Sequence, residues 1–121
     1  MSKRILVIED QEDNRRILRD LLTSASYEII EAVTGEEGVT LAETHRPDLI
    51  LMDIQLPGLD GYEATRRIKA NPALRGIPII AVTSYALSGD DVKALQAGCD
   101  AYVTKPFSPR QLLAKIREYL P

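Results

Sequence analysis

The sequence holds little aromatic or thiol chemistry. It has no tryptophan, one phenylalanine, one histidine and one cysteine, Cys99. A lone cysteine cannot form an internal disulfide bond, so a reducing, cytoplasmic setting fits the chain best. No apolar run approaches the length of a membrane span, and residues 1–4 lead into an apolar run without the pattern of a signal peptide. We therefore expect a cytoplasmic protein without a membrane segment.

The chain also lacks the basic excess of a nucleic-acid-binding protein. Its formal net charge is −3 at pH 7, and its lysines and arginines are scattered, mostly beside acidic residues. A content of 45% hydrophobic and 27% charged residues is typical of a globular domain. A chain of 121 residues is long enough for one domain with its own core. We expect a single domain over residues 1–121, with no linker, repeat or output domain.

Short apolar runs alternate with helical stretches along the whole chain. The strand-length runs lie at 5–8, 29–33, 49–52, 79–82 and 101–103. Five strand–helix repeats predict an α/β domain whose parallel sheet is covered by helices on both faces. Glu28 and Glu31 in and beside the second run indicate an edge strand, because central parallel strands are almost wholly apolar.

The helical stretches carry recognisable start signals and apolar faces. Thr34, Asp60 and Ser108 are predicted N-caps with Glu or Gln three residues on, and Ser88 begins a further helix. The first helix has a one-face apolar pattern formed by Ile17, Leu18, Leu21, Leu22 and Ala25. We expect Arg15 and Arg16 on the solvated face of this helix, close enough to its start to meet a partner protein.

Charged residues follow three of the apolar runs, where the predicted strands end. Glu9 and Asp10 close the first run, Asp53 closes the third, and Lys105 follows the fifth. Ligands of an open parallel sheet bind in the crevice outside the carboxyl ends of its strands. The three strand ends therefore predict one site.

Three carboxylates at one site need a cation. Two unit charges about 4 Å apart repel by roughly 4 kcal/mol at an effective dielectric of about 20. Mg2+ binds oxygen ligands, takes one or two carboxylates and shares its other positions with water or phosphate. Lys105 adds a second positive charge, and Thr83 adds a hydroxyl at the end of the fourth run. This combination suits phosphoryl transfer onto Asp53.

These motifs resemble those of the response-regulator receiver domains of two-component signalling. The resemblance covers the whole chain and rests on Glu9-Asp10, residues 48–58 around Asp53, Thr83, Tyr102 and Lys105-Pro106. The stretch around Asp53 and the absence of an output domain also resemble the single-domain DivK-type regulators. The resemblance implies a flavodoxin-like fold with strand order 2-1-3-4-5 and, often, a cis peptide bond before Pro106.

The same resemblance implies how the site works. Asp53 would accept a phosphoryl group from the phosphohistidine of a histidine kinase or histidine phosphotransferase. Mg2+ would be bound by Asp10, Asp53 and the backbone carbonyl of Gln55, with Glu9 acting directly or through water.

Activation would follow from that phosphorylation. Lys105 would pair with Asp53 and then with the phosphate, Thr83 would swing to the phosphoryl group, and Tyr102 would move inward behind it. The face formed by the fourth helix, fifth strand and fifth helix would then change its affinity for a downstream protein, as a monomer or an activation-dependent dimer. Gln55 and Tyr85 occupy the positions that tune hydrolysis of the acyl phosphate, while packing is the alternative role for Tyr102.

Other functions remain as alternatives. A Mg2+-dependent aspartyl-phosphate phosphatase or mutase needs an acid/base carboxylate two residues after the nucleophile, where this chain has Gln55, and usually a cap over its substrate. A flavin mononucleotide carrier needs a loop of hydroxyl residues and glycine after the first strand, whereas residues 9–13 here are acidic or amide. We therefore predict a phosphoacceptor signalling domain rather than an enzyme.

Overall fold

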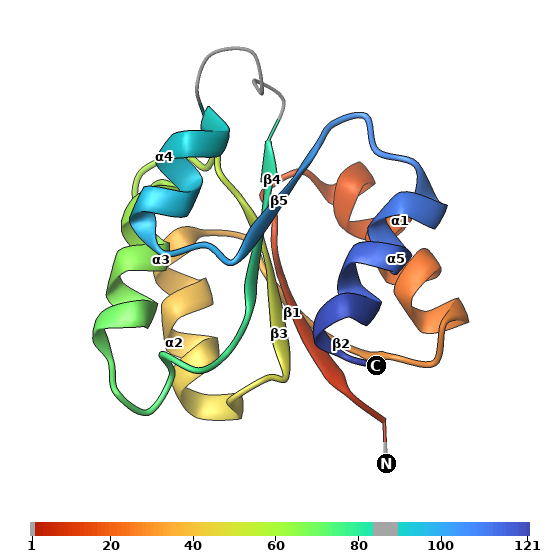
Figure 1. The fold of residues 1–121 in the computed structure, drawn as a ribbon, viewed down its shortest axis with the longest axis horizontal. Coiled ribbons are helices and arrows are strands. Elements are labelled where there is room, and N and C mark those ends of the chain that lie inside the picture. The colour runs from red at the N-terminus through yellow and green to blue at the C-terminus, as the bar shows by residue number, and fades with distance from the viewer. Residues whose placement is uncertain (1, 84–89) are drawn as a thin grey trace.

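The fold is an α/β sandwich built around one parallel sheet (Figure 1). The computed structural model describes residues 2–83 and 90–121, so Tyr85 and Ser88 lie outside the described residues. Within these residues, strands and helices alternate in the order β1 (Arg4–Ile8), α1 (Glu12–Ser24), β2 (Glu28–Ala32), α2 (Gly35–His45), β3 (Leu49–Asp53), α3 (Gly61–Ala70), β4 (Ile79–Thr83), α4 (Asp90–Ala97), β5 (Ala101–Thr104) and α5 (Pro109–Tyr119).

The sheet has the strand order β2-β1-β3-β4-β5, with every pair parallel. This order confirms the predicted fold class. Helices α1 and α5 cover one face of the sheet, and α2, α3 and α4 cover the other (Figure 1). The strand β2 lies at an edge, as predicted, and Glu28 on it is exposed.

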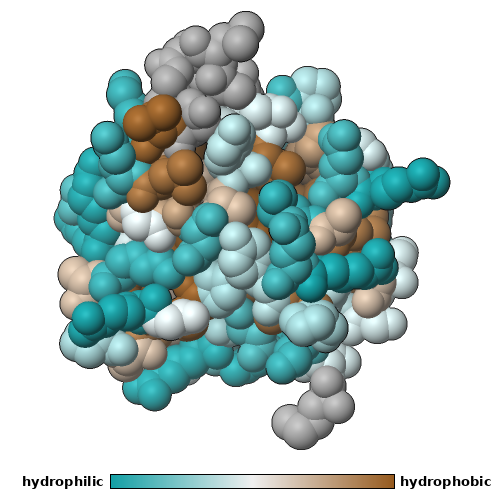
Figure 2. Space-filling view, viewed as in Figure 1, coloured by the Kyte–Doolittle hydropathy of each residue, from teal (hydrophilic) through white to brown (hydrophobic). Residues whose placement is uncertain are grey.

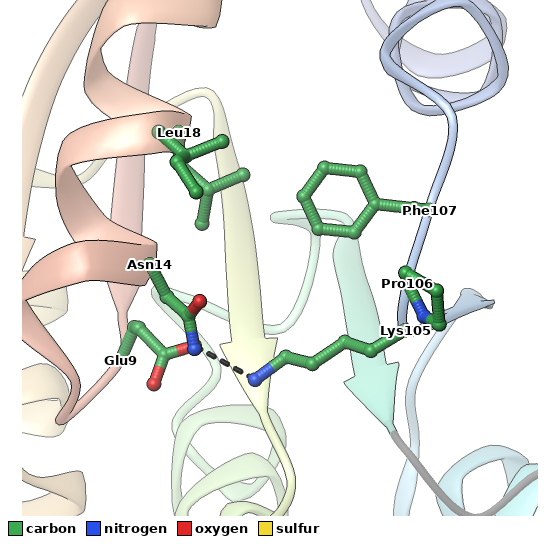
Figure 3. Close-up of a pocket in the computed structure, with 7 residues that line it drawn as sticks. Glu9, Asn14, Leu18, Lys105, Pro106 and Phe107 are labelled. Carbon is green, nitrogen blue, oxygen red and sulfur yellow. Dashed lines mark hydrogen bonds and ion pairs between the residues drawn. The ribbon is translucent and has the colours of Figure 1, made fainter.

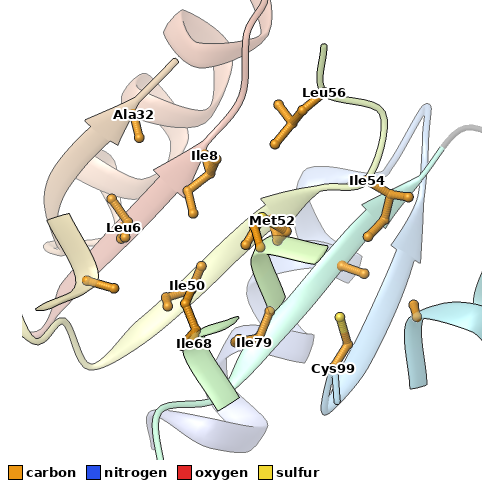
Figure 4. Packing of buried hydrophobic residues seen from close by; sticks show 14 of the residues in the cluster. Leu6, Ile8, Ala32, Ile50, Met52, Ile54, Leu56, Ile68, Ile79 and Cys99 are labelled. Atoms are coloured by element: carbon orange, nitrogen blue, oxygen red, sulfur yellow. The ribbon is translucent and has the colours of Figure 1, made fainter. Parts of the chain in front are cut away.

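Each central strand supplies side chains to both layers of the core. In β1, Leu6 and Ile8 face the α2–α3–α4 layer shown in Figure 4. Their neighbours Ile5 and Val7 face the α1–α5 layer. Burial of each such side chain contributes about 1.5–3 kcal/mol relative to leaving it in water. This two-sided burial explains why the runs in β1, β3 and β4 are continuously apolar.

Local sequence signals set the helix starts. The side chains of Thr34 and Asp60 accept hydrogen bonds from the backbone N–H three residues on, at 3.1 and 2.9 Å. Ser108 makes the equivalent contact at 3.5 Å, with Pro109 in the first turn. The three predicted N-caps are confirmed.

The peptide bond between Lys105 and Pro106 is cis, as the resemblance implied.

Two predictions for α1 were wrong. Ile17 is 53% exposed rather than buried, although it shares the apolar pattern of Leu18 and Leu22. Arg15 was expected in solvent, but only 12% of its side chain is exposed. Both residues lie in the N-terminal half of α1, where the functional site begins.

Among the described residues, the structure contains no helix with the length and apolarity needed to cross a membrane.

Candidate functional site

Three carboxylates meet at the carboxyl edge of the sheet. Strands β1 and β3 pair in parallel with Ile8 beside Met52, so the residues that follow them emerge side by side. Each of Glu9, Asp10 and Asp53 offers a carboxylate oxygen, and these atoms lie within 4.8 Å of one another. Glu9 and Asp53 are buried, whereas Asp10 is half-buried. The register of two parallel strands thus creates a concentrated negative site.

Lys105 brings a positive charge to this site from the segment after β5. Its Nζ lies 2.9 Å from Glu9 Oε1 and 3.5 Å from Asp53 Oδ2, and Figure 3 shows the extended side chain reaching across. Its backbone N–H donates to the Thr83 carbonyl at 2.7 Å, which fixes its position at the end of β4. Burial by itself lowers the pKa of the Lys105 ammonium, but the hydrogen bond to Glu9 and the charge of Asp53 outweigh it, so the pKa lies above its usual value. Lys105 is therefore a cation at neutral pH.

Backbone contacts orient the Asp53 carboxylate. Its Oδ1 accepts a hydrogen bond from the Gln55 N–H at 3.1 Å, and its Oδ2 faces Lys105. Gly61 packs against the backbone here: a Cβ at this position would lie 2.5 Å from the Asp53 carbonyl oxygen and 2.7 Å from Ile54 Cα. The absence of a side chain at residue 61 therefore lets α3 begin directly beside the end of β3.

Thr83 lies at the end of the next strand, and Tyr102 lies in the edge strand β5. Thr83 ends β4 and is fully buried, one residue beyond Val82, which pairs with Asp53. Tyr102 in β5 pairs with Ala81 in β4. The Tyr102 side chain is 37% exposed and lines a surface pocket with Leu95, Lys115 and Tyr119. The structure thus gathers Glu9, Asp10, Asp53 and Lys105, with Thr83 at the next strand end and Tyr102 on the outer surface.

The residues of the site fit a divalent cation. Three carboxylates and one ammonium leave an excess of two negative charges (three minus one) around the cluster. All the candidate ligand atoms are oxygens, which Mg2+ prefers. Within the described residues, the buried Nε2 of Gln55 has no hydrogen-bond partner.

A groove that the sequence analysis did not predict borders this site. It has a volume of about 520 Å³ and lies between α1 and the segment after β5 (Figure 3). Its walls are formed by Glu9, Asn14, Ile17, Leu18, Lys105, Pro106 and Phe107. The exposed Ile17 belongs to this groove, and its place in the apolar pattern of α1 was the available signal.

Comparison with known proteins decides the family. A family model described as the response regulator receiver domain matches residues 5–117. The chain belongs to this family. As a receiver domain it resembles the polar-differentiation response regulator DivK of Brucella anthropi, with 46% identity over 120 residues, 99% of this chain and 98% of DivK.

Solved receiver structures share the whole fold. The receiver domain of the sensor histidine kinase PA1611 from Pseudomonas aeruginosa, with a magnesium ion coordinated in its active-site cleft, is 40% identical with a TM-score of 0.94 over 99% of this chain and 98% of that chain. A second neighbour comes from the co-crystal structure of the Saccharomyces cerevisiae histidine phosphotransfer protein Ypd1 with the receiver domain of the response regulator Ssk1. It is 32% identical with a TM-score of 0.90, over 98% of this chain and 88% of that chain.

Proposed function

We propose that this receiver domain acts as a stand-alone response regulator whose Asp53 accepts a phosphoryl group from a phosphohistidine. The observation that carries the proposal is the buried Asp53 carboxylate, which shares its site with two other carboxylates and lies 3.5 Å from Lys105 Nζ. The 46% identity to a DivK response regulator, over 98% of the length of that protein, supports this role.

The chemistry is a phosphoryl transfer between two side chains. A carboxylate oxygen of Asp53 forms a bond to phosphorus as the bond from phosphorus to the donor histidine nitrogen breaks. The nitrogen keeps the bonding electron pair and the imidazole becomes neutral. A bound Mg2+ supplies charge neutralisation for the phosphoryl oxygens, and Asp10, Asp53 and the Gln55 carbonyl would hold it, with Glu9 direct or through water.

The side chains of the site divide the remaining tasks. Lys105 supplies a fixed positive charge to the transferring group, and catalysis of this kind is positioning and charge stabilisation. Thr83 provides a hydroxyl donor at the neighbouring strand end. Gln55 stands two residues after the nucleophile and cannot act as a general acid or base, which favours a stored acyl phosphate over turnover of a small substrate.

Two surfaces suit two kinds of partner. The groove between α1 and Phe107 opens beside Lys105 and would receive the phosphodonor, a histidine kinase or phosphotransferase. The second surface, formed by α4, β5 and α5, carries the exposed Val92, Leu95 and Tyr102, and Figure 2 shows hydrophobic side chains gathered over α4. On phosphorylation, Thr83 would swing toward the phosphoryl group and Tyr102 would move inward behind it, which would change the affinity of this surface for a downstream protein.

The test is phosphorylation by a small N–P donor, phosphoramidate, in the presence of Mg2+. We expect the wild type to gain the mass of one phosphoryl group and Asp53→Asn to gain none. Asp60→Asn is the matched control, since it makes the same chemical change at the N-cap of α3, where asparagine caps as well as aspartate. The proposal is wrong if the wild type gains no phosphoryl group with Mg2+, or if Asp53→Asn gains as much as the control.

A further inference from the structure

Arg15 links the acidic site to the edge of the sheet. Its Nη1 donates to the backbone carbonyl of Glu9 at 3.0 Å. Its Nη2 pairs with Glu12, and its Nε lies 3.5 Å from Glu31 Oε1 on β2. With 12% of its side chain exposed, Arg15 is an internal connection rather than a solvated charge.

The bond to the Glu9 carbonyl completes the fixation of that residue. The Glu9 N–H donates to the Ala32 carbonyl at 3.0 Å. One carboxylate oxygen accepts from the Gln11 N–H at 3.1 Å, and the other from Lys105 at 2.9 Å. Arg15 thus holds the remaining polar atom of Glu9.

The orientation of the Glu9 carbonyl matters for Asp10. A peptide unit is planar, so the direction of its carbonyl also fixes the direction of the following N–H and Cα. The carbonyl held by Arg15 belongs to the peptide that joins Glu9 to Asp10. Arg15 therefore fixes the position of the Asp10 Cα, from which one of the three carboxylates of the site extends.

The charge of Arg15 is compensated where it lies. An isolated guanidinium near a cation site would repel Mg2+, but Glu12 and Glu31 flank this one. Glu31 also accepts two hydrogen bonds of 2.8 Å from Arg19. These bonds lower the pKa of the Glu31 carboxyl group, which stays ionised. The contribution of Arg15 is thus one of geometry.

We propose that Arg15 is a positioning residue that fixes the Glu9–Asp10 peptide so that Asp10 faces Mg2+. The inference rests on one part of the proposed function, the binding of Mg2+ at this site. Fixing the groups behind a metal ligand commonly raises metal affinity, since the ligand no longer has to be ordered on binding.

Arg19 offers a matched control. It pairs with the same two carboxylates, Glu31 and Glu12, but its contacts do not include Glu9. Loss of Arg19 removes ion pairs of the same network and leaves the bond between Arg15 and the Glu9 carbonyl in place. Arg15→Lys keeps the charge but replaces the planar fork by a single ammonium, which cannot serve Glu9, Glu12 and Glu31 together.

The experiment is calorimetric titration of the unphosphorylated protein with MgCl2, alongside urea unfolding in a metal chelator. We expect Arg15→Met and Arg15→Lys each to raise the Kd for Mg2+ about threefold to tenfold, below the range for groups that contact a ligand atom. Arg19→Met should stay within about twofold of the wild type, because partly exposed ion pairs contribute little. If Arg15→Met does not fold in the unfolding assay, the Arg15→Lys result decides.

Several results would overturn the inference. These are an unchanged or lower Kd in Arg15→Met, a wild-type Kd in Arg15→Lys, an equal rise in Arg19→Met, or no Mg2+ binding by the wild type. Failure of the proposed function looks different. In that case the wild type binds Mg2+ and the Arg15 variants bind it more weakly, but phosphoramidate does not phosphorylate Asp53.

Discussion

The charged site and the α4–β5 surface of this receiver domain are built in opposite ways. At the site, Glu9 and Asp53 are buried, and Lys105 bonds to the first and pairs with the second. On the α4–β5 surface, Val92 and Leu95 are about half exposed, at 53% and 49%. Burying a charge costs free energy unless a partner stays within bonding distance, so the paired groups of the site have to keep fixed positions. Exposed apolar side chains make few internal contacts, so that surface can change at low cost.

This difference suits a signalling protein. A phosphoryl transfer site needs fixed groups, because small displacements of catalytic groups are costly in rate. A surface that reports phosphorylation needs two arrangements of similar free energy. Substitutions in each region test whether the two regions differ in this way.

Removal of Lys105 should have the largest effect on stability. In Lys105→Met the buried carboxylates of Glu9 and Asp53 lose their cation, and loss of one partner of a buried pair costs about 3–5 kcal/mol. Lys105 is 20% exposed, so we expect about 2–4 kcal/mol in urea unfolding without divalent ions. Millimolar Mg2+ should restore more stability to this variant than to the wild type, because the ion replaces the lost charge.

Lys69→Met is the matched control for this prediction. Lys69 is 19% exposed and bonds to Asp100 and to the carbonyls of Arg75 and Ile77, away from the acidic site. Its removal should also destabilise the domain, but Mg2+ should stabilise that variant no more than the wild type. Equal responses of the two variants to Mg2+ would contradict the rigid, cation-dependent site.

Crowding of the Asp53 backbone should have the next largest effect. In Gly61→Ala the new Cβ meets the Asp53 carbonyl oxygen at 2.5 Å, so the backbone has to shift. Overpacking of this kind costs about 1–3 kcal/mol, and we expect slower phosphorylation of Asp53 as well. Urea unfolding and the phosphoramidate assay measure the two effects.

Gly76→Ala is the control for this crowding. Among the described residues, apart from Gly76 and its two chain neighbours, no atom lies within 4 Å of a Cβ at Gly76, and its φ is not in the left-handed region. The substitution should be neutral or stabilise the domain by about 0.4–1 kcal/mol, by restricting the unfolded chain. If Gly61→Ala is as stable as the wild type, the backbone at the end of β3 adapts easily and the site is not rigid.

Polar substitution on the α4–β5 surface should have the smallest effect on stability. Leu95→Ser should change the free energy of unfolding by less than about 0.5 kcal/mol, because the side chain lies on the surface and is about half exposed. Leu112→Ala, on the buried face of α5, should cost about 2–5 kcal/mol in the same assay. A cost above about 1 kcal/mol for Leu95→Ser would mean that this surface is packed like the core.

The alternation of apolar runs and helical stretches predicted the fold class, and the charged strand ends predicted where the site lies. Alternating apolar runs can only be buried by a covered parallel sheet, and the charges at the strand ends are brought together by strand pairing. Position relative to the strand ends was therefore enough to predict four residues of the site: Glu9, Asp10, Asp53 and Lys105.

The contacts among these residues, and the helical side chains that join them, become visible only in the folded structure. Lys105 lies closer to Glu9 than to Asp53, and Arg15 turns from the expected solvent face toward the Glu9 carbonyl. Ile17 shares the pattern of Leu18 yet remains exposed beside the groove. Helical periodicity shows which side chains share a face but not where the covering elements end. Where a covering element ends, and which carboxylate each cation pairs with, depend on distances between segments far apart in the chain.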